Sequence, residues 1–559
     1  MTGGDTSGAG IDVEGAGANT VNNYGTVNSG AGLAGYALRG GSGADTINNY
    51  GLITGQIELA TGANAFNNML GGTLSSGTVM NLAAGNMLTN AGTLSTGGSG
   101  TVLTTSMIGN FTQTSTGRML IDTSGVLNDK LLVDGSATVG GKVTFASSSN
   151  VLGSWTVLTT LGAAPAPTST ATLGNIILTG NVSVVGQNVV ANVTGLDFTN
   201  GQSGTNAALG SYLNGSYASV APNLIANLFN LSSAPALSAA YNQLAPGQVA
   251  RTGAATIVSG LSFANRLMSC PTNEGANVFI REGQCVWAVT DGQRATQKSS
   301  GSDPSSEMKS ARIAAGAQYA IAPDLFAGFA FSYNSVRAST AAGQSSTGDE
   351  YSVGATVKYN AGPLLLAAAV TGATASYKNT RNIAFGDLHE TAVSSPDVSR
   401  VGGRLRSAYL FDLGGAYLKP MVDVDLQNVR VSASTETGSA NSNLRMLAAN
   451  HWVASASPAV EVGGQMQADG SAFSYRPFVR IGASAYSTKH FKVNSYFDMA
   501  GPSFGTFSTA STIDPVTLDL AAGVDILNTS AYSLKLSYDG RYGSTTKTHT
   551  AGFKAALQF

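Results

Sequence analysis

Histidine, cysteine and paired carboxylates are the residues of this sequence that could do chemistry, and all of the histidines and cysteines lie after residue 269. The four histidines and two cysteines are His389, His451, His490, His549, Cys270 and Cys285. Ser-His-Asp and Cys-His nucleophiles and most zinc sites need such side chains, so residues 1–269 cannot form them. Two acid pairs, Asp12 with Glu14 and Asp129 with Asp134, could support glycosidase or lyase chemistry. Their spacing does not distinguish them from surface acids, so we expect no catalysis and no cofactor.

Two glycine-rich stretches match the letters of known ligand motifs. Gly30–Gly35 fits the dinucleotide pattern G-x-G-x-x-G, but no strand and helix flank it to position a pyrophosphate. Gly40–Asn48 fits the calcium-binding nonapeptide, whose ion lies between tandem copies, and the sequence has one copy. We therefore expect turns at both places and no metal.

The composition favours β-structure with many turns. Of the 559 residues, 43% are apolar, 11% are charged and 70 are glycine, whereas roughly a quarter of residues are charged in soluble proteins. Glycine-rich sequence is poor helix material, and the length predicts two or three structural units. The net charge of −2 gives no reason to expect a nucleic-acid partner. No apolar run reaches the ~18 residues of a transmembrane helix. The first five residues show no signal peptide, so the start of an exported chain would lie upstream.

From Val286 onward the sequence alternates between apolar and polar residues. In one segment Leu325, Phe329 and Tyr333 share a face, while Ser332 and Asn334 share the other. Such alternation predicts strands, and about ten tilted residues cross a bilayer. Twelve segments follow it: 286–294, 308–321, 324–337, 348–359, 362–378, 397–411, 413–431, 450–466, 472–487, 514–528, 531–543 and 546–559.

The connections between these segments decide between a membrane barrel and a soluble β-domain. They alternate between long and short, and an even number of strands brings both barrel ends to the periplasmic side. We therefore predict an all-β fold with a 12-stranded outer-membrane β-barrel at the C-terminus; a soluble domain is the alternative. Charges on the inward face require a wet or polar lumen. Those expected to line it are Arg404, Arg406, Asp423, Asp425, Glu461, Arg480, Asp519, Asp525, Lys535, Asp539 and Arg541.

The last strand carries the most specific signal. It ends on Phe559, with Leu557 and Phe553 on the same face and Gly552 beside them. With these features the sequence resembles a monomeric autotransporter, a bacterial type V secretion protein, over almost its whole length. The resemblance implies that these four residues form the signal read by the outer-membrane assembly machinery, which can capture an exposed edge strand. It also implies contact with outer-membrane lipid and periplasmic chaperones, and a passenger at the cell surface.

The residues before the barrel predict helices. Residues 222–229 and 234–244 read as short helices ended by Pro246 and Gly247. Residues 248–268 follow without proline and, at 1.5 Å per residue, span about 30 Å, roughly one hydrocarbon thickness. By resemblance this is the linker helix that plugs the barrel; a helix packed on a soluble neighbour is the alternative.

Four residues of this pore helix are singled out. Gly253 and Gly260 give it a slim cross-section, and Arg251 and Arg266 are expected to face inward acids. The candidate acids are Asp423, Asp425, Glu461, Asp519 and Asp525. Self-cleaving relatives carry an Asn-Asn or Asn-Asp junction in this helix. Asn265 is followed here by arginine, so cleavage inside the barrel is not expected.

Cys270 and Cys285 have fourteen residues between them. That is a comfortable loop for a disulfide in an oxidising compartment. Two free thiols are the alternative.

An internal repeat marks the N-terminal region. Val21–Val27 recurs as Ile47–Ile53, and looser copies follow at 66–74 and 88–94. The period and the short apolar strands predict a parallel β-helix, a solenoid in which stacked asparagines can form a ladder; low-complexity disorder is the alternative. The aligned asparagines are Asn23, Asn49, Asn68 and Asn90, which lie 26, 19 and 22 residues apart.

By resemblance, the chain has four parts. These are passenger repeats in 1–107, an autochaperone-like end in 108–196, a linker with the pore helix in 197–270 and the barrel in 271–559. We expect an autotransporter whose outer-membrane barrel exports and anchors its own small surface-displayed solenoid. An adhesin-like role toward host or neighbouring-cell surface ligands rests on family analogy alone. The alternatives are the translocator of an enzyme whose catalytic domain lies upstream, and a simple outer-membrane pore.

Overall fold

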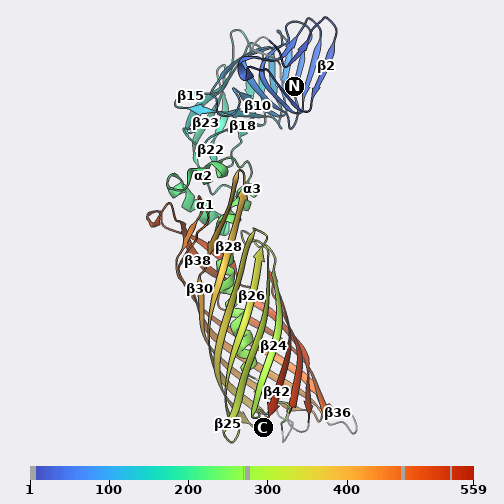
Figure 1. The fold of residues 1–559 in the computed structure, drawn as a ribbon, viewed down its shortest axis with the longest axis vertical. Coiled ribbons are helices and arrows are strands. Elements are labelled where there is room, and N and C mark those ends of the chain that lie inside the picture. The colour runs from blue at the N-terminus through green and yellow to red at the C-terminus, as the bar shows by residue number, and fades with distance from the viewer. Residues whose placement is uncertain (1–7, 269, 271–276, 468–472, 529–531) are drawn as a thin grey trace. The chain divides into compact units, whose positions relative to one another are not determined.

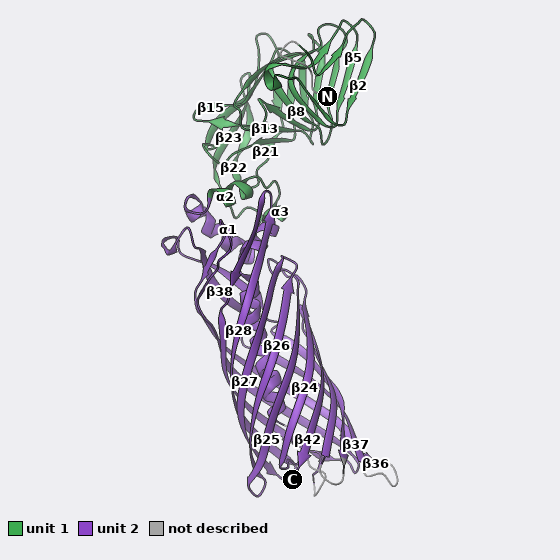
Figure 2. Ribbon diagram, in the orientation of Figure 1, with its two compact units in different colours: residues 1–201, 222–237 green, residues 202–221, 238–559 purple. Residues whose placement is uncertain are grey.

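The computed structural model describes residues 8–268, 270, 277–467, 473–528 and 532–559. The chain divides into two compact units (Figure 2). The N-terminal unit comprises residues 1–201 and 222–237, and the barrel unit comprises residues 202–221 and 238–559. None of the described helices has the length and apolar character needed to cross a membrane.

The N-terminal unit is built largely from short parallel strands stacked in register, as the repeat predicts (Figure 1). One sheet contains, in spatial order, β2 (Asn19–Asn23), β5 (Asp45–Asn49), β7 (Ala65–Asn68), β9 (Met87–Asn90), β12 (Asn110–Gln113), β17 (Ala137–Val139) and β20 (Thr168–Ser169). Alternate residues of these strands, such as Ile47, Phe66 and Leu88, point inward and are buried. Because each rung contributes equivalent apolar side chains, stacking produces a continuous core.

A second sheet completes the stack. Its strands are β1 (Ile11–Val13), β3 (Thr26–Asn28), β4 (Tyr36–Gly40), β6 (Leu52–Glu58), β8 (Thr73–Asn81), β10 (Thr93–Thr96), β11 (Thr104–Ile108), β13 (Arg118–Ile121), β16 (Lys130–Val133), β18 (Lys142–Phe145), β19 (Gly153–Thr160), β21 (Thr172–Leu173), β22 (Leu178–Val185) and β23 (Asn188–Leu196). The last pairs, β19–β23 and β22–β23, are antiparallel. Smaller elements are the 3-10 turn η1 (Gly32–Ala34), the pair β14 (Thr123–Ser124) and β15 (Leu127–Asn128), and helix α2 (Pro222–Phe229).

The predicted asparagine ladder is present and one rung longer than the repeat suggested. Asn23 donates to Asn49, Asn49 to Asn68 and Asn68 to Asn90, each over 2.8 Å from Nδ2 to Oδ1. Asn90 donates in turn to Gln113 Oε1 at 2.9 Å. Asn49, Asn68 and Asn90 are completely buried. A buried amide needs such partners, so the ladder explains why polar side chains occupy the core of the stack.

Within the described residues of the barrel unit, twelve antiparallel strands close into the predicted barrel (Figure 1). They are β24 (Cys285–Gln297), β25 (Ser306–Ala322), β26 (Leu325–Thr340), β27 (Gln344–Ala361), β28 (Leu364–Phe385), β30 (Asp397–Tyr409), β32 (Ala416–Val431), β35 (Ala449–Gly464), β37 (Phe473–Tyr486), β40 (Val516–Asn528), β41 (Tyr532–Tyr542) and β42 (Thr546–Gln558). Strand β24 pairs with β25 on one side and with β42 on the other. Closure pairs the backbone groups of the strands with one another, which a bilayer requires.

The predicted alternation separates an outer from an inner face. Phe329, Phe331 and Val370 are more than half exposed, whereas Ser332 and Asn334 are buried. The outer face is therefore apolar and the inner face polar, the arrangement of a barrel surrounded by lipid.

The long connections gather at one end of the barrel, the long-loop end, and tight turns lie at the other, the short-turn end. The connection predicted over 338–347 is much shorter than expected, because β26 and β27 continue to pair up to Ser339 and Ser345. Strand β29 (Leu388–Ser394) folds back on β28. Other connections form a small sheet from β33 (Ser434–Thr435), β34 (Leu444–Met446), β38 (His490–Phe497) and β39 (Phe507–Thr512). Two short strands, β31 (Phe411–Asp412) and β36 (Met466–Gln467), extend the sheet near the turns.

Helices precede the barrel. The predicted helices appear as α2, α3 (Ala234–Leu244) and α4 (Gly247–Leu267), whereas α1 (Gly204–Ser216) was not predicted. Helix α1 packs on the small sheet, where the Tyr212 ring lies 6.1 Å from that of Phe497 and 5.4 Å from that of Phe507, centroid to centroid. Short 3-10 turns, η2 (Tyr217–Ser219) and η3 (Pro502–Phe504), complete the unit.

Candidate functional site

Helix α4 lies inside the barrel, as predicted for the pore helix (Figure 1). At its start, the Gln248 backbone N–H donates to Gln344 Oε1 at 2.9 Å, beside the turn between β26 and β27. At its end, Phe263 and Leu267 pack in one cluster with Trp287, close to the first residues of β24. The chain therefore enters the lumen at the long-loop end and leaves it at the short-turn end.

Two glycines allow α4 to lie against the barrel unit's side chains. A Cβ added at Gly253 would lie 2.3 Å from the Phe491 ring. One added at Gly260 would lie 2.2 Å from Gln427 Oε1 and 2.6 Å from Arg400 Nη1. Real Cβ atoms do not approach so closely, so a side chain at either position would require a neighbour to move: the buried Phe491 ring at residue 253, and the ends of the Gln427 and Arg400 side chains at residue 260.

The middle of the helix joins two buried charges of the wall. The Ser259 hydroxyl donates to Glu350 Oε1 at 2.7 Å and accepts from Arg312 Nη2 at 2.8 Å. Arg312 lies on β25 and Glu350 on β27. One hydroxyl thus links the helix to two strands whose charges would otherwise be costly to bury.

The partners predicted for the two helix arginines were wrong. Arg251 pairs with Asp303, and Arg266 Nη2 lies 2.8 Å from Asp291 Oδ2. Asp303 and Asp291 belong to the β24–β25 part of the barrel. The acids expected instead are occupied by cations of the wall, so they are not the partners of the helix.

These wall pairs account for the predicted lumen charges. Arg406 Nε lies 2.6 Å from Asp423 Oδ1, Arg404 Nε 2.7 Å from Asp425 Oδ1, and Lys419 Nζ 2.5 Å from Glu461 Oε1. Further round the wall, the partners are Arg480 with Asp539, Lys535 with Asp525 and Arg541 with Asp519. Pairing removes most of the cost of placing charge inside the barrel, although each pair adds little net stability.

Asn265 connects the helix to two of these pairs. Its Oδ1 accepts from Arg406 Nη2 at 2.9 Å and also from Arg404 Nη1. Since both guanidiniums are already held by Asp423 and Asp425, the amide meets a rigid pair of donors. The side chain therefore fixes the end of the helix against β30.

The helix does not fill the lumen. A cavity of about 270 Å³ lies between Ser262, Asn265 and Arg266 of the helix and the charged side chains of β32, β35, β37, β40 and β41. Such a space holds several water molecules. The lumen beside the helix is therefore wet, as its charges predict.

Several buried charges of the lumen were missed by the sequence-based prediction, among them Asp291, Arg312, Glu350, Lys358, Arg400 and Arg476. Each occupies an inward position of an alternating strand. The alternation of apolar and polar residues that separated the two faces of β26 would also have identified these residues as inward-facing.

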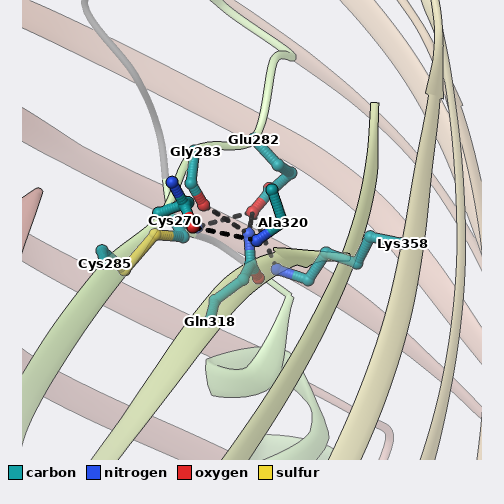
Figure 3. The surroundings of a disulfide bond; sticks show 8 residues. Cys270, Glu282, Gly283, Cys285, Gln318, Ala320 and Lys358 are labelled. Atoms are coloured by element: carbon teal, nitrogen blue, oxygen red, sulfur yellow. Dashed lines mark hydrogen bonds and ion pairs between the residues drawn. A yellow bond between two sulfur atoms is a disulfide. The ribbon is translucent and has the colours of Figure 1, made fainter. Parts of the chain in front are cut away.

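The structure shows the predicted disulfide and the positions of the predicted C-terminal signal residues. Cys270 and Cys285 are joined by a disulfide (Figure 3). Phe553, Leu557 and Phe559 are exposed on the outer face of β42, and the Phe559 ring lies 5.2 Å from that of Tyr319. A Cβ at Gly552 would meet only ordinary contacts, the nearest at 3.5 Å, so packing does not demand glycine there.

One carboxylate of each candidate acid pair in the N-terminal unit has a structural partner. Asp12 lies 3.6 Å from Arg39. Asp129 is buried and accepts from the Leu103 and Asp122 backbone N–H groups at 2.8 and 2.9 Å. Its burial raises the pKa of this carboxyl to about 7. Asp129 therefore ties neighbouring rungs together.

The two glycine-rich motifs lie in solenoid turns and strands. Residues 30–35 contain the 3-10 turn η1, and residues 40–48 lead into β5, where Asp45 Oδ1 accepts from Asn19 at 2.9 Å. Within the described ranges, no group of three or more His, Cys, Asp or Glu side chains could hold a metal ion.

Comparison with known proteins identifies the barrel. Residues 286–539 match the family model of the autotransporter beta-domain. The solved translocator domain of autotransporter NalP from Neisseria meningitidis is similar, with 13% identity and a TM-score of 0.45 over 56% of this chain and 100% of that one. The beta domain of the Bordetella autotransporter BrkA shows 16% identity and a TM-score of 0.36 over 50% and 100%. The transport unit of the autotransporter AIDA-I from Escherichia coli shows 12% identity and a TM-score of 0.36 over 54% of this chain and 97% of that one. No curated protein sequence matches the chain.

Proposed function

Because its barrel is an autotransporter β-domain of the bacterial outer membrane, we propose that this chain translocates, anchors and displays its own N-terminal unit. The observation that carries the proposal is the course of α4, which occupies the lumen and is covalently continuous with residues 1–246. The chain that leads to the N-terminal unit leaves the lumen at the long-loop end. Long loops of outer-membrane barrels face outward, which supports the proposed display of this unit outside the cell.

The contacts of α4 support the proposed anchoring. Gln344, Asp303, Glu350 and Asp291 bind the helix from its start to its end. These partners belong to β24, to β27 and to the connection between β24 and β25, so the helix is held by the wall at several levels. A chain held in this way stays attached after export.

The displayed unit is proposed to bind surface ligands, in the manner of an adhesin, and not to catalyse a reaction. Its β2–β20 sheet carries an outward row of amides and hydroxyls, one from each rung and in register. The row consists of Asn22, Asn48, Asn67, Thr89, Thr112, Thr138 and Thr168. Neighbouring rungs lie about 4.8 Å apart, so the row presents regularly spaced, uncharged hydrogen-bonding groups. Host or neighbouring-cell glycans and proteins offer matching groups.

Protease added to intact bacteria tests translocation. The full chain, expressed behind a signal peptide, should lose its N-terminal unit to external protease. A control chain that ends at Cys285 lacks the barrel strands after Cys285 and should keep that unit protected in the periplasm. Protection of both chains would contradict the proposal.

Adhesion of bacteria that display the unit tests the binding role. The double variant Asn48→Lys/Thr89→Lys places two charges in the row and should reduce attachment to host or bacterial surfaces several-fold. The control Lys142→Gln changes an exposed charge of the other sheet. Equal attachment by all three forms would exclude this face as the binding surface.

A further inference from the structure

We propose that residues 277–285, which we call the plug segment, form a second closure of the lumen at the short-turn end, held in place by the Cys270–Cys285 disulfide. This proposal depends on the proposed function in one respect only, namely that the short-turn end faces the periplasm. The closure is separate from α4, which ends at Leu267.

The need for a second closure follows from the cavity beside α4. That cavity reaches from the helix to the opposite wall and is lined at one end by Phe279, Ile280, Arg281 and Glu282 of the plug segment. Because much of the remaining lining is charged and therefore wet, the helix alone does not block small solutes. The plug segment forms the floor that separates this water from the short-turn end.

One half of the plug segment packs on the wall through apolar contacts. Ile280 is buried in a cluster with Leu365, Ala408, Leu410 and Tyr417. The ring of Phe279 stacks on that of Tyr417 at 4.6 Å, and the Arg476 guanidinium lies 5.4 Å from the Phe279 centroid. These contacts reach β28, β30, β32 and β37.

The other half is held by a buried ion pair with β27, which adjoins β28 in the wall (Figure 3). Glu282 Oε2 lies 2.8 Å from Lys358 Nζ, and both side chains are less than a tenth exposed. The same oxygen accepts from Gln318 Nε2 at 3.0 Å and from the Cys270 backbone N–H at 2.8 Å. Lys358 lies on β27 and Gln318 on β25. The plug segment is therefore attached to six strands around the wall.

The disulfide limits how far this closure can move. It holds the Cα atoms of Cys270 and Cys285 6.2 Å apart. The fourteen residues between them, fully extended at about 3.5 Å each, would otherwise allow roughly 50 Å of movement. That is longer than α4 itself, about 31 Å for its 21 residues. The bond therefore prevents both the plug segment and the end of the helix from leaving the lumen when the chain is pulled outward.

Formation of the disulfide requires an oxidant. Two thiols lose two protons and two electrons as the sulfur–sulfur bond forms. A periplasmic protein disulfide can accept them and leave as a dithiol. The plug segment is then fixed in the lumen only after the Cys270 and Cys285 thiols have been oxidised.

Conductance of the purified full-length chain in planar bilayers tests the proposal. The oxidised protein should show low conductance. Tris(2-carboxyethyl)phosphine should raise it several-fold, and the variant Cys270→Ser/Cys285→Ser should behave like the reduced protein. Glu282→Gln/Lys358→Met removes both buried charges without leaving one unpaired, and should also raise it with the disulfide intact.

Asp519→Asn/Arg541→Met is the matched control, because it removes an ion pair between two wall strands, β40 and β41, near the long-loop end and not beside the plug segment. Heat-modifiable migration verifies that each barrel is folded. Low conductance in the reduced protein and in both plug variants would overturn the proposal, as would an equal rise in the control. Conductance does not depend on export, so a failure of surface display with these conductance changes would count against the proposed function alone.

Discussion

Gly260 lies so close to Arg400 that a methyl group at residue 260 would stand 2.6 Å from the arginine's Nη1 atom. Arg400 projects from β30 and is buried. Seven residues earlier, Gly253 meets Phe491 in the same way. Glycine at these positions therefore sets how closely the helix approaches its surroundings in the lumen.

Replacing Gly260 with leucine is expected to disturb the seated helix without preventing barrel insertion. The added side chain must displace Arg400 or the helix, so display of the N-terminal unit should fall several-fold while heat-modifiable barrel remains in the outer membrane. Ala255→Leu is the control, since Ala255 faces a cavity of about 130 Å³. Antibody binding to intact cells gives the comparison. Equal display by the two variants would show that close approach at residue 260 is unimportant.

Asn68→Leu is expected to destabilise the solenoid far more than Asn67→Leu. Asn68 is completely buried and both accepts from Asn49 and donates to Asn90, so its loss leaves buried amide groups unpaired at about 1–3 kcal/mol each. Asn67 is half-buried on the outer face, where water can replace its partners. Trp155 fluorescence during thermal unfolding, in a chain with Trp287 and Trp452 changed to phenylalanine, reports the difference. A similar decrease in the unfolding temperature for both variants would mean that the asparagine ladder contributes little to stability.

The stability of the N-terminal unit is expected to fall as the pH rises from about 4 to about 7. Burial raises the pKa of Asp129 from 3.8 to about 7 in the folded chain. Burial also raises the pKa of nearby Asp122. The folded state therefore holds a proton that the unfolded state releases near pH 4, and this stabilising contribution is lost as the pH passes the folded-state pKa.

The same Trp155 melting curves, recorded at pH 5 and pH 8, test this dependence. The midpoint should be higher at pH 5. Asp129→Asn should remove most of the difference, whereas Asp134→Asn, which changes an exposed acid five residues later, should preserve it. A midpoint that rises with pH in the unaltered chain would contradict the assignment.

Phe559→Ser is expected to lower the amount of barrel in the outer membrane, because an aromatic side chain would be missing from the strand that the assembly machinery captures. Phe411→Ser is a suitable control, since Phe411 is also an exposed aromatic residue near the short-turn end. Heat-modifiable barrel in outer-membrane fractions is the measurement. Equal amounts in the two variants would assign no special role to the terminal residue.

The alternation of apolar and polar residues, the spacing of the repeated asparagines and the lengths of the connections predicted most of this fold. Each of the twelve alternating segments contains an observed strand, and Asn23, Asn49, Asn68 and Asn90 stack as their spacing indicated. Such patterns depend on neighbours along one strand or one rung. They could not predict that β26 and β27 continue into the connection between them, because those residues show the composition of a loop.

Contacts across the lumen could not be predicted in the same way. Alternation places a side chain inside the barrel but does not say at which height or beside which strand. Arg251 therefore pairs with Asp303, a loop residue, and not with an acid of the later strands. Helix α1 was missed for a related reason, because its small residues favour a helix only when Tyr212 packs on the β38–β39 sheet.

Labelling of two inserted tags on intact bacteria tests whether the chain displays its N-terminal unit through this barrel. One tag follows Gly186, in the turn between β22 and β23 of the N-terminal unit, and the other follows Gly362, in the turn between β27 and β28 at the short-turn end. Both glycines have positive φ, +59° and +60°, and open space around them, so the two insertions are structurally matched. We expect labelling at Gly186 in intact cells, and at Gly362 only after the outer membrane is permeabilised. Labelling at Gly362 but not at Gly186 in intact cells would contradict this expectation.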